Sequence, residues 1–246
     1  MAYWIFISDA HLSLKHPHLQ DGILNFLNDI EKDLTDLVIV GDLFEFWFGG
    51  KGFSFPEYQP LLDKFHDFIK KGINIYYLEG NHDFNMGEIF SNLGVMVYTV
   101  PLTLILDGKK LFISHGDLTN MVNLRYKIFR KFLKNPLTYK MLEKLGPTLV
   151  KKAASFMSKR SERKWKLKRD SNTPSIFRNF AKTLIENGYD VVILGHSHIP
   201  EIALIKTKKK IGLYYNLGDW ITNFSYLKYE PQKGFELNFY KHEKKP

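Results

Sequence analysis

Short hydrophobic runs alternate with longer amphipathic stretches along most of this chain. Runs of apolar and β-branched residues bounded by polar or turn residues predict strands. Such runs cover Tyr3–Ile7, Leu37–Val40, Ile73–Leu78, Val95–Tyr98, Leu102–Leu106, Lys109–Ser114, Val191–Leu194, Glu201–Lys206, Ile211–Asn216 and Phe235–Tyr240. Helical spacing of apolar residues predicts helices over His18–Lys32, Tyr58–Lys71 and Ser175–Asn187. This order of elements is typical of a layered protein of mixed α and β structure.

The second half of the chain shows signs of antiparallel pairing. Asp107-Gly108 separates two alternating runs, which predicts a hairpin whose second strand ends next to His115. The stretch from Glu201 to Asn216 predicts another antiparallel pair. A mixed sheet, or two sheets packed face to face, therefore fits better than a purely parallel sheet.

A basic segment interrupts this alternation between residues 121 and 169. It holds 16 lysines and arginines against two acids, whereas the remainder holds 19 bases against 24 acids. Asn135-Pro136 and Gly146-Pro147 divide it into short pieces with helical spacing. We therefore expect a single domain over residues 1–246, with residues 119–172 inserted as a helical cap over the strand ends.

Composition narrows the chemistry that is available. The chain has 246 residues, of which 44% are hydrophobic, so it can fill a large core. It has no cysteine, so any metal must be held by oxygen and imidazole ligands. Met1 leads directly into the first predicted strand, and no window approaches the roughly 18 consecutive apolar residues of a membrane span. We expect neither a signal peptide nor a transmembrane helix.

Five short motifs place metal-binding residue types directly after hydrophobic runs. They are Asp9-Ala10-His11, Gly41-Asp42, Gly80-Asn81-His82-Asp83, His115-Gly116-Asp117 and Gly195-His196-Ser197-His198. A lone Gly-Asp is usually a turn, but all five sit at predicted strand ends, where open sheets collect their ligands. Together they predict a metal centre with the ligands Asp9, His11, Asp42, Asn81, His115, His196 and His198.

The ligand types favour two ions. Residues two apart in an extended segment point the same way, so Asp9 and His11 can address one ion. Asp42 follows a glycine that permits a sharp turn, and a carboxylate there can bridge two ions. Mixed oxygen and imidazole ligands suit manganese, iron or zinc better than calcium.

A two-metal site of this kind can hydrolyse phosphate esters and anhydrides. Two ions clamp a phosphate and lower the pKa of a shared water, which attacks phosphorus. No side-chain nucleophile is required, consistent with the lack of cysteine and of any Gly-x-Ser-x-Gly element. We expect His82 to stabilise the developing charge or to protonate the leaving oxygen, with Asp83 holding its other ring nitrogen. His82 and Asp83 are therefore the candidate catalytic residues.

The ordered set Asp-x-His, Gly-Asp, Gly-Asn-His-Asp, His and Gly-His-x-His resembles that of the calcineurin-like metallophosphoesterases. The resemblance covers the chain outside the basic insertion. It implies an α+β fold, a four-layer α/β/β/α sandwich with the dimetal centre at one edge and an inserted helical cap. It also implies that one ion is held by Asp9, His11, Asp42 and His198, and the other by Asp42, Asn81, His115 and His196.

Longer strings around these motifs resemble the UDP-2,3-diacylglucosamine diphosphatases. The strings are Ser8–Leu12, Gly41–Trp47, Gly80–Phe84, His115–Asp117 and Asn216–Trp220. The resemblance implies cleavage of a UDP-linked glycolipid, a lipid A precursor, to UMP and 2,3-diacylglucosamine 1-phosphate with two Mn²⁺ ions. It implies a cytoplasmic enzyme, peripheral on the inner face of the inner membrane. It also implies substrate contacts at Asn81, Asp117, Tyr126, Arg160, Arg163 and Lys164.

The chain departs from that pattern at two places. The diphosphatases have an arginine at the position of His82, so His82 follows the general phosphoesterase pattern instead. After Met157 the cap has no clear copy of the Asn and Lys substrate contacts of those enzymes. Both departures concern the substrate rather than the metal ligands.

The basic insertion leaves alternatives open. Lysines and arginines among large aliphatic residues suit a substrate with an anionic head and acyl tails, and an anionic bilayer surface. The same charges together with Tyr126, Tyr139 and Trp165 would also suit a nucleic acid, so a nuclease or cyclic-nucleotide phosphodiesterase is the alternative function. The lack of a nucleic-acid-binding motif makes it the less favoured one. An inactive metal-stabilised scaffold is a third hypothesis, against which His82 and the full ligand set argue.

Overall fold

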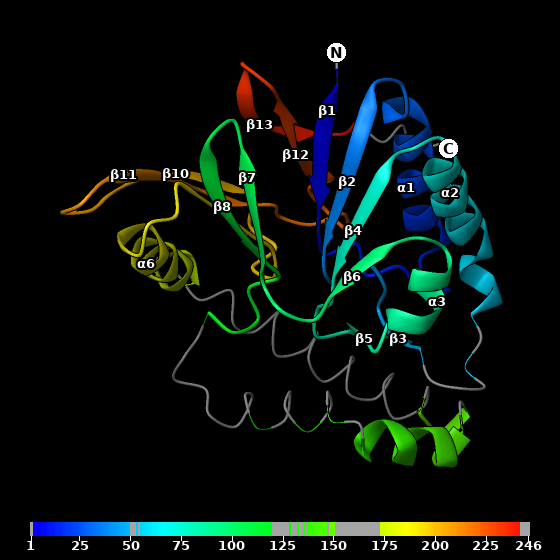
Figure 1. Cartoon of the computed structure of the whole chain (residues 1–246). Helices are drawn as coiled ribbons and strands as arrows, with labels where there is room; N and C mark the ends of the chain where they lie inside the picture. The colour runs from blue at the N-terminus through cyan, green and yellow to red at the C-terminus, as the bar shows by residue number, and fades with distance from the viewer. Residues whose placement is uncertain are drawn as a thin grey trace.

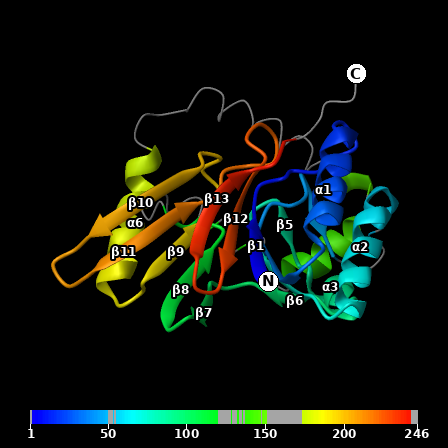
Figure 2. The ribbon, with the colours of Figure 1, turned by 90° about the horizontal axis from the view of Figure 1, so that it is seen from above.

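The computed structural model describes residues 2–49, 53, 55–119, 128, 132, 135, 137–146, 148–150 and 173–241. These residues form two main β-sheets, which pack face to face and carry helices on their outer faces (Figure 1). A view from above shows the two sheets side by side, with α6 overlapping β10 and β11 on one side and α1, α2 and α3 grouped on the other (Figure 2). The predicted four-layer α/β/β/α sandwich is confirmed.

The first sheet has six strands in the order β13-β12-β1-β2-β4-β6. β1, β2, β4 and β6 run parallel, whereas β12 is antiparallel to β1 and β13 is antiparallel to β12. The carboxyl ends of its four parallel strands therefore lie along one edge. The strand bounds are β1 (Tyr3–Ile7), β2 (Leu34–Val40), β4 (Asn74–Leu78), β6 (Met96–Tyr98), β12 (Ser225–Glu230) and β13 (Gly234–Phe239).

The second sheet has five strands in the order β10-β11-β9-β8-β7. Its three central strands are parallel, and both of its edge strands are antiparallel to their neighbours. Both predicted antiparallel pairs are confirmed: β7 with β8, and β10 with β11. The bounds are β7 (Leu102–Leu106), β8 (Lys109–Ser114), β9 (Val191–Leu194), β10 (Glu201–Lys206) and β11 (Ile211–Asn216).

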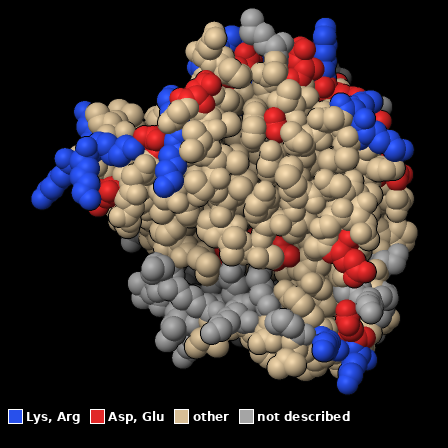
Figure 3. Space-filling model, in the orientation of Figure 1, with Lys and Arg blue, Asp and Glu red and all other residues tan. Residues whose placement is uncertain are grey.

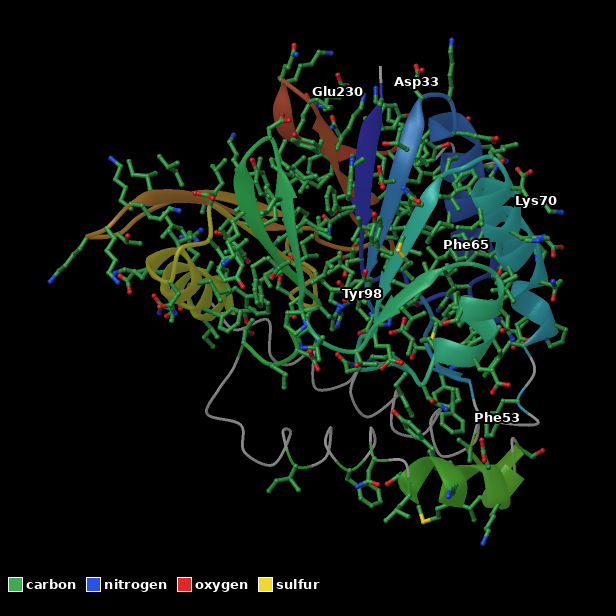
Figure 4. All side chains as sticks on the ribbon, in the orientation of Figure 1. Asp33, Phe53, Phe65, Lys70, Tyr98 and Glu230 are labelled. Carbon is green, nitrogen blue, oxygen red and sulfur yellow. The ribbon has the colours of Figure 1, made fainter. Side chains whose placement is uncertain are left out.

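The helices follow from amphipathic spacing. Pro17 stands in the first turn of α1, where a missing N–H costs nothing, and Leu19, Ile23 and Phe26 form its buried face. In α2, Phe65 lies on the side facing the first sheet and Lys70 on the outer side (Figure 4). No helix among the described residues is long and apolar enough to cross a membrane. The bounds are α1 (Pro17–Ile30), η1 (Pro56–Tyr58), α2 (Gln59–Lys70), α3 (Gly87–Asn92) and α6 (Thr173–Glu186).

Three apolar clusters separate the four layers. Because side chains alternate along a strand, Ile5 and Ile7 of β1 face the helices while Phe6 faces the second sheet. In β9, Ile193 likewise faces the first sheet, and Val192 packs against α6. Both strands that carry these residues are buried on both faces, which explains their continuous hydrophobic runs.

The structure contains elements that the hydrophobic pattern did not predict. β12 alternates buried and half-buried residues, but Lys228 interrupts its apolar run. α3 has only six residues, and β3 (Trp47–Phe48) and β5 (Asp83–Phe84) have two each, too short to show a period. β3 and β5 pair in parallel as a separate small sheet.

The predicted cap lies mostly outside the described residues. Within residues 119–172, residues 137–146 are helical, and Tyr139 lies against Phe48 and Phe84 with ring centroids 5.7 and 6.5 Å apart. The cap itself stays a prediction.

On the face shown in Figure 3, the largest group of described Lys and Arg side chains lies over the β10–β11 hairpin.

The packing of α1 against the end of the chain can be tested at Phe26. Its ring is fully buried and lies 4.6 Å from Trp220 and 4.9 Å from Tyr226, between centroids. We expect Phe26→Ala to lower the free energy of unfolding by about 3–5 kcal/mol in urea denaturation, because it leaves a cavity. The control Phe239→Ala removes a ring that is 58% exposed and should change it by less than about 0.5 kcal/mol. Equal effects would contradict the assigned core.

Candidate metal centre

All seven predicted metal ligands come from strand ends that meet at one edge of the sandwich. Asp9, Asp42 and Asn81 follow β1, β2 and β4 of the first sheet, while His115 and His196 follow β8 and β9 of the second. Six of these side chains, together with that of His82, lie within reach of one another in three overlapping groups. The groups are Asp9, His11 and His198; His11, Asp42 and His82; and Asp42, His115 and His196.

The backbone at this edge is held in an unusual conformation. Asp9, His11, Asp42, His196 and His198 all have φ between +46° and +67°, in the left-handed region that side chains other than glycine rarely adopt. Such conformations persist only where the surrounding structure enforces them, and they cluster at functional sites. The loops therefore turn sharply after each strand and direct five of the predicted ligands inward.

The two carboxylate oxygens of Asp9 have different surroundings: one accepts hydrogen bonds, and the other faces imidazole nitrogens. Its Oδ2 accepts hydrogen bonds from the Ser8 hydroxyl and, at 2.8 Å, from the His196 N–H. Its Oδ1 is buried without a hydrogen-bond partner and lies 3.3 Å from His198 Nε2 and 3.7 Å from His11 Nε2. A buried carboxylate oxygen without a hydrogen-bond partner, facing two imidazole nitrogens, fits a cation ligand.

The two carboxylate oxygens of Asp42 differ in the same way. Its Oδ1 accepts hydrogen bonds from the N–H groups of Asn81 at 2.8 Å and His82 at 2.9 Å. This close approach requires a glycine at position 80, since a Cβ there would lie 2.0 Å from Oδ1. Oδ2 faces the centre, 3.2 Å from His115 Nε2 and 3.9 Å from His11 Nε2. The Asp42 carboxylate thus lies between the imidazoles of His11 and His115.

Four potential metal-binding atoms, one of them His115 Nε2, lie close together. This Nε2 lies 3.2 Å from Asn81 Oδ1 and 3.1 Å from His196 Nδ1, in addition to the contact with Asp42. The His115 Nδ1 donates to the Val40 carbonyl at 2.9 Å, which directs Nε2 into the centre. An amide oxygen, a carboxylate oxygen and two imidazole nitrogens thus surround one point.

The charges at this point are strongly coupled. Burial alone would raise the pKa of Asp42, but the imidazoles of His115 and His82 hold it well below its usual range. Burial lowers the pKa of His115, yet the carboxylates of Asp42 and Asp9 raise it to about 10. Burial and the adjacent charge of His115 lower the pKa of His196 to about 4. The two carboxylates therefore favour positive charge next to them, whereas His196 is neutral near pH 7.

These residues fit divalent cations. Asp9 Oδ1 and His11 Nε2 are buried, lack hydrogen-bond partners and face the same space. Carboxylate, amide and imidazole donors without thiolate suit manganese, iron or zinc. Two further carboxylates, which the sequence reasoning missed, lie behind the histidines: Glu45 is 3.4 Å from His11 Nδ1, and Asp219 is 3.7 Å from His198 Nδ1. Asp219 follows a glycine shortly after β11, as Asp42 follows Gly41 after β2. This shared Gly-Asp pattern could have identified Asp219 as a candidate site residue.

The structure corrects the predicted contact between Asp83 and His82. The Asp83 carboxylate is fully buried and accepts hydrogen bonds from the N–H groups of Gly80, Asp42 and Leu43 and from the Tyr77 hydroxyl. His82 Nδ1 instead contacts the backbone carbonyl of Glu45 at 2.9 Å. Asp83 begins β5, next to several backbone N–H groups that need an acceptor, so it joins the loops of Asp42 and Asn81 and does not orient the His82 ring.

The predicted substrate contacts are only partly described. Asn81 lies in the centre, and Asp117 is buried close enough to His115 and His196 to favour their charged forms. Tyr126, Arg160, Arg163 and Lys164 lie outside the described residues. Their role as substrate contacts stays a prediction.

The role of Asp83 can be tested through stability. Asp83→Ala leaves three backbone N–H groups and one hydroxyl unpaired, at about 1–3 kcal/mol for each buried group. We expect Asp83→Ala to lower the free energy of unfolding by at least about 4 kcal/mol, measured by urea denaturation with EDTA present. The control Tyr77→Phe removes one hydrogen-bond donor and should lower it by about 1 kcal/mol. If Asp83→Ala does not fold, Asp83→Asn provides the intermediate case. Equal losses for the Asp83 variants and Tyr77→Phe would contradict this role.

Comparisons with known proteins agree with this geometry. A chain of Psychromonas ingrahamii named UDP-2,3-diacylglucosamine hydrolase is 28% identical over 231 residues, covering 93% of this chain and 94% of the relative. Chains of the same name from Blochmanniella pennsylvanica and Vibrio atlanticus are 30% identical, covering 88% and 94% of this chain and 87% and 95% of theirs. The family model described as calcineurin-like phosphoesterase matches residues 4–200. The chain therefore belongs to the calcineurin-like phosphoesterase family and is a metal-dependent hydrolase.

Proposed function

We propose that this enzyme hydrolyses the pyrophosphate bond of UDP-2,3-diacylglucosamine to give UMP and 2,3-diacylglucosamine 1-phosphate. The observation that carries the proposal is that relatives named for this substrate match nearly the full length of the chain at 28–30% identity. In the reaction, a water oxygen bonds to one phosphorus as the bridging P–O bond breaks. The departing phosphate oxygen then takes up a proton.

Two groups of residues would hold the cations. The side chains of both groups lie within reach of one another. Asp42 Oδ2 lies between His11 Nε2 and His115 Nε2. Divalent ions bound there, for which we propose Mn²⁺, would neutralise phosphate charge and lower the pKa of water. We assign Asp9, His11, Asp42 and His198 to one ion and Asp42, Asn81, His115 and His196 to the other.

His82 is the candidate donor to the reacting phosphate. The Glu45 carbonyl can only accept a hydrogen bond, so the Nδ1 of His82 carries a proton. Nε2 therefore bears a proton only when the ring is cationic. The ring lies edge-on to His11, with centroids 4.8 Å apart, and is half-buried. In that position a cationic His82 can stabilise developing charge or protonate the leaving oxygen.

The inserted segment would supply the lipid specificity. Sixteen lysines and arginines between residues 121 and 169 suit the anionic head of the substrate, and the aliphatic residues among them suit its acyl chains. Binding to an anionic membrane surface and a cytoplasmic, peripheral location are part of the same proposal.

Product analysis tests the proposed reaction. The full chain is incubated with UDP-2,3-diacylglucosamine and Mn²⁺ in detergent, and the products are identified by mass spectrometry. We expect UMP and a lipid monophosphate in equal amounts, and neither product from Asp42→Ala, since Asp42 is assigned to both ions. Cleavage of cyclic nucleotides or DNA with no turnover of the UDP-lipid would contradict the proposal and favour the nuclease or phosphodiesterase alternative.

A second test concerns His82. His82→Ala should lower kcat on the UDP-lipid by about 10²–10⁴-fold, the usual contribution of a general acid, while Mn²⁺ stoichiometry stays unchanged. His82→Arg separates the two roles, because a guanidinium donates hydrogen bonds but does not give up its proton. Recovery in His82→Arg would indicate charge stabilisation, and continued loss would indicate proton transfer. Full activity of His82→Ala would show that the assignment is wrong.

A further inference from the structure

Glu45 lies between the loop that carries His11 and the loop that carries His82. Its backbone N–H donates to the Leu12 carbonyl at 3.0 Å, next to the parallel bridge of Leu12 with Phe44. Two residues later, the Trp47 N–H donates to the His82 carbonyl at 3.0 Å, where the pairing of β3 with β5 begins. The Glu45 backbone is therefore fixed on both sides by loops of the metal centre.

Two acceptor groups of Glu45 reach two different imidazoles. Its side-chain Oε2 lies 3.4 Å from His11 Nδ1, and its backbone carbonyl oxygen lies 2.9 Å from His82 Nδ1. The side chain of Glu45 is 32% exposed, so water screens this contact only in part. Both rings are held through Nδ1, which leaves Nε2 as the free nitrogen of each.

The consequence for His11 is a defined ligand atom. A carboxylate on Nδ1 keeps the proton there, so the lone pair of a neutral ring is on Nε2. That Nε2 lies 3.7 Å from Asp9 Oδ1 and 3.9 Å from Asp42 Oδ2 and has no hydrogen-bond partner. A carboxylate behind a ligating histidine fixes its tautomer and ring orientation and makes it a stronger ligand.

We propose that Glu45 is a positioning residue, whose carboxylate prepares His11 as a ligand while its carbonyl fixes the ring of His82. The inference rests on the proposed function, because it assigns His11 to a metal ion and His82 to the reacting phosphate. Glu45 contacts neither substrate nor metal in this account. It acts through the two imidazoles, so the ligand at one ion and the proton donor are set by the same residue.

Binding of Mn²⁺ to the full chain tests the side-chain contact without substrate. The chain is titrated with Mn²⁺, and the EPR signal of the free ion gives the affinity of each binding step. Glu45→Ala should weaken one of two binding steps by about 10–100-fold and leave the other unchanged. Glu45→Gln should keep most of the affinity, because its amide oxygen still accepts from His11 Nδ1. The control Glu57→Ala, which removes a half-buried carboxylate from η1, should bind both ions as the unaltered chain does.

A spectroscopic measurement separates positioning from a general effect on folding. In ¹⁵N-histidine-labelled protein loaded with diamagnetic Zn²⁺, the Nδ1–H proton of His11, assigned through His11→Gln, should be protected from exchange with water. We expect that signal in the unaltered chain and in Glu45→Gln, and its loss in Glu45→Ala.

Unchanged Mn²⁺ affinity and an unchanged His11 signal in Glu45→Ala would overturn the proposal. Equal weakening of both binding steps together with a lower melting temperature would also overturn it, because it would indicate a structural role. If the unaltered chain bound no Mn²⁺, the metal centre of the proposed function would fail as well. Normal binding by the unaltered chain with no effect of Glu45→Ala would overturn the positioning role alone.

Discussion

The burial of two carboxylates at the edge of a β-sandwich is the constraint on which the rest of this site depends. Asp9 and Asp42 are 0% and 1% exposed, and a buried carboxylate costs several kcal/mol unless charges and hydrogen bonds compensate it. In each, one oxygen accepts hydrogen bonds and the other faces imidazoles. The donors are the Ser8 hydroxyl and one backbone N–H for Asp9, and two backbone N–H groups for Asp42. The second oxygen of Asp9 has no hydrogen-bond partner and that of Asp42 faces imidazoles, so the centre is suited to cations.

The fold serves this constraint by bringing strand ends together. In the first sheet, β1, β2 and β4 run parallel, so the loops after them share one edge. In the second sheet, the β7–β8 hairpin sets the direction of β8, which pairs in parallel with β9 and delivers His115 next to His196. Face-to-face packing then closes the gap between the two edges. The candidate ligands therefore lie in loops that directly follow strands of the two sheets.

The hydrophobic pattern predicted most strands, because strands buried on both faces appear as continuous hydrophobic runs. The four layers were implied by the family resemblance. The sequence also predicted the seven ligand candidates, since each follows such a run. It did not predict the role of Asp83 or Glu45. Two of the four hydrogen bonds of Asp83 and both acceptor contacts of Glu45 depend on close approach between loops that are about 35–40 residues apart in the chain. A motif gives the residue type at a position, but the acceptor of an imidazole nitrogen depends on tertiary structure.

The central claim is that these side chains enclose two cations that share Asp42. Anomalous scattering from crystals grown with Mn²⁺ tests it most directly. The account predicts two peaks about 3.5–4 Å apart, one among Asp9, His11, Asp42 and His198 and one among Asp42, Asn81, His115 and His196. Crystals that showed no anomalous peak among these residues, or a single ion bound elsewhere, would contradict it.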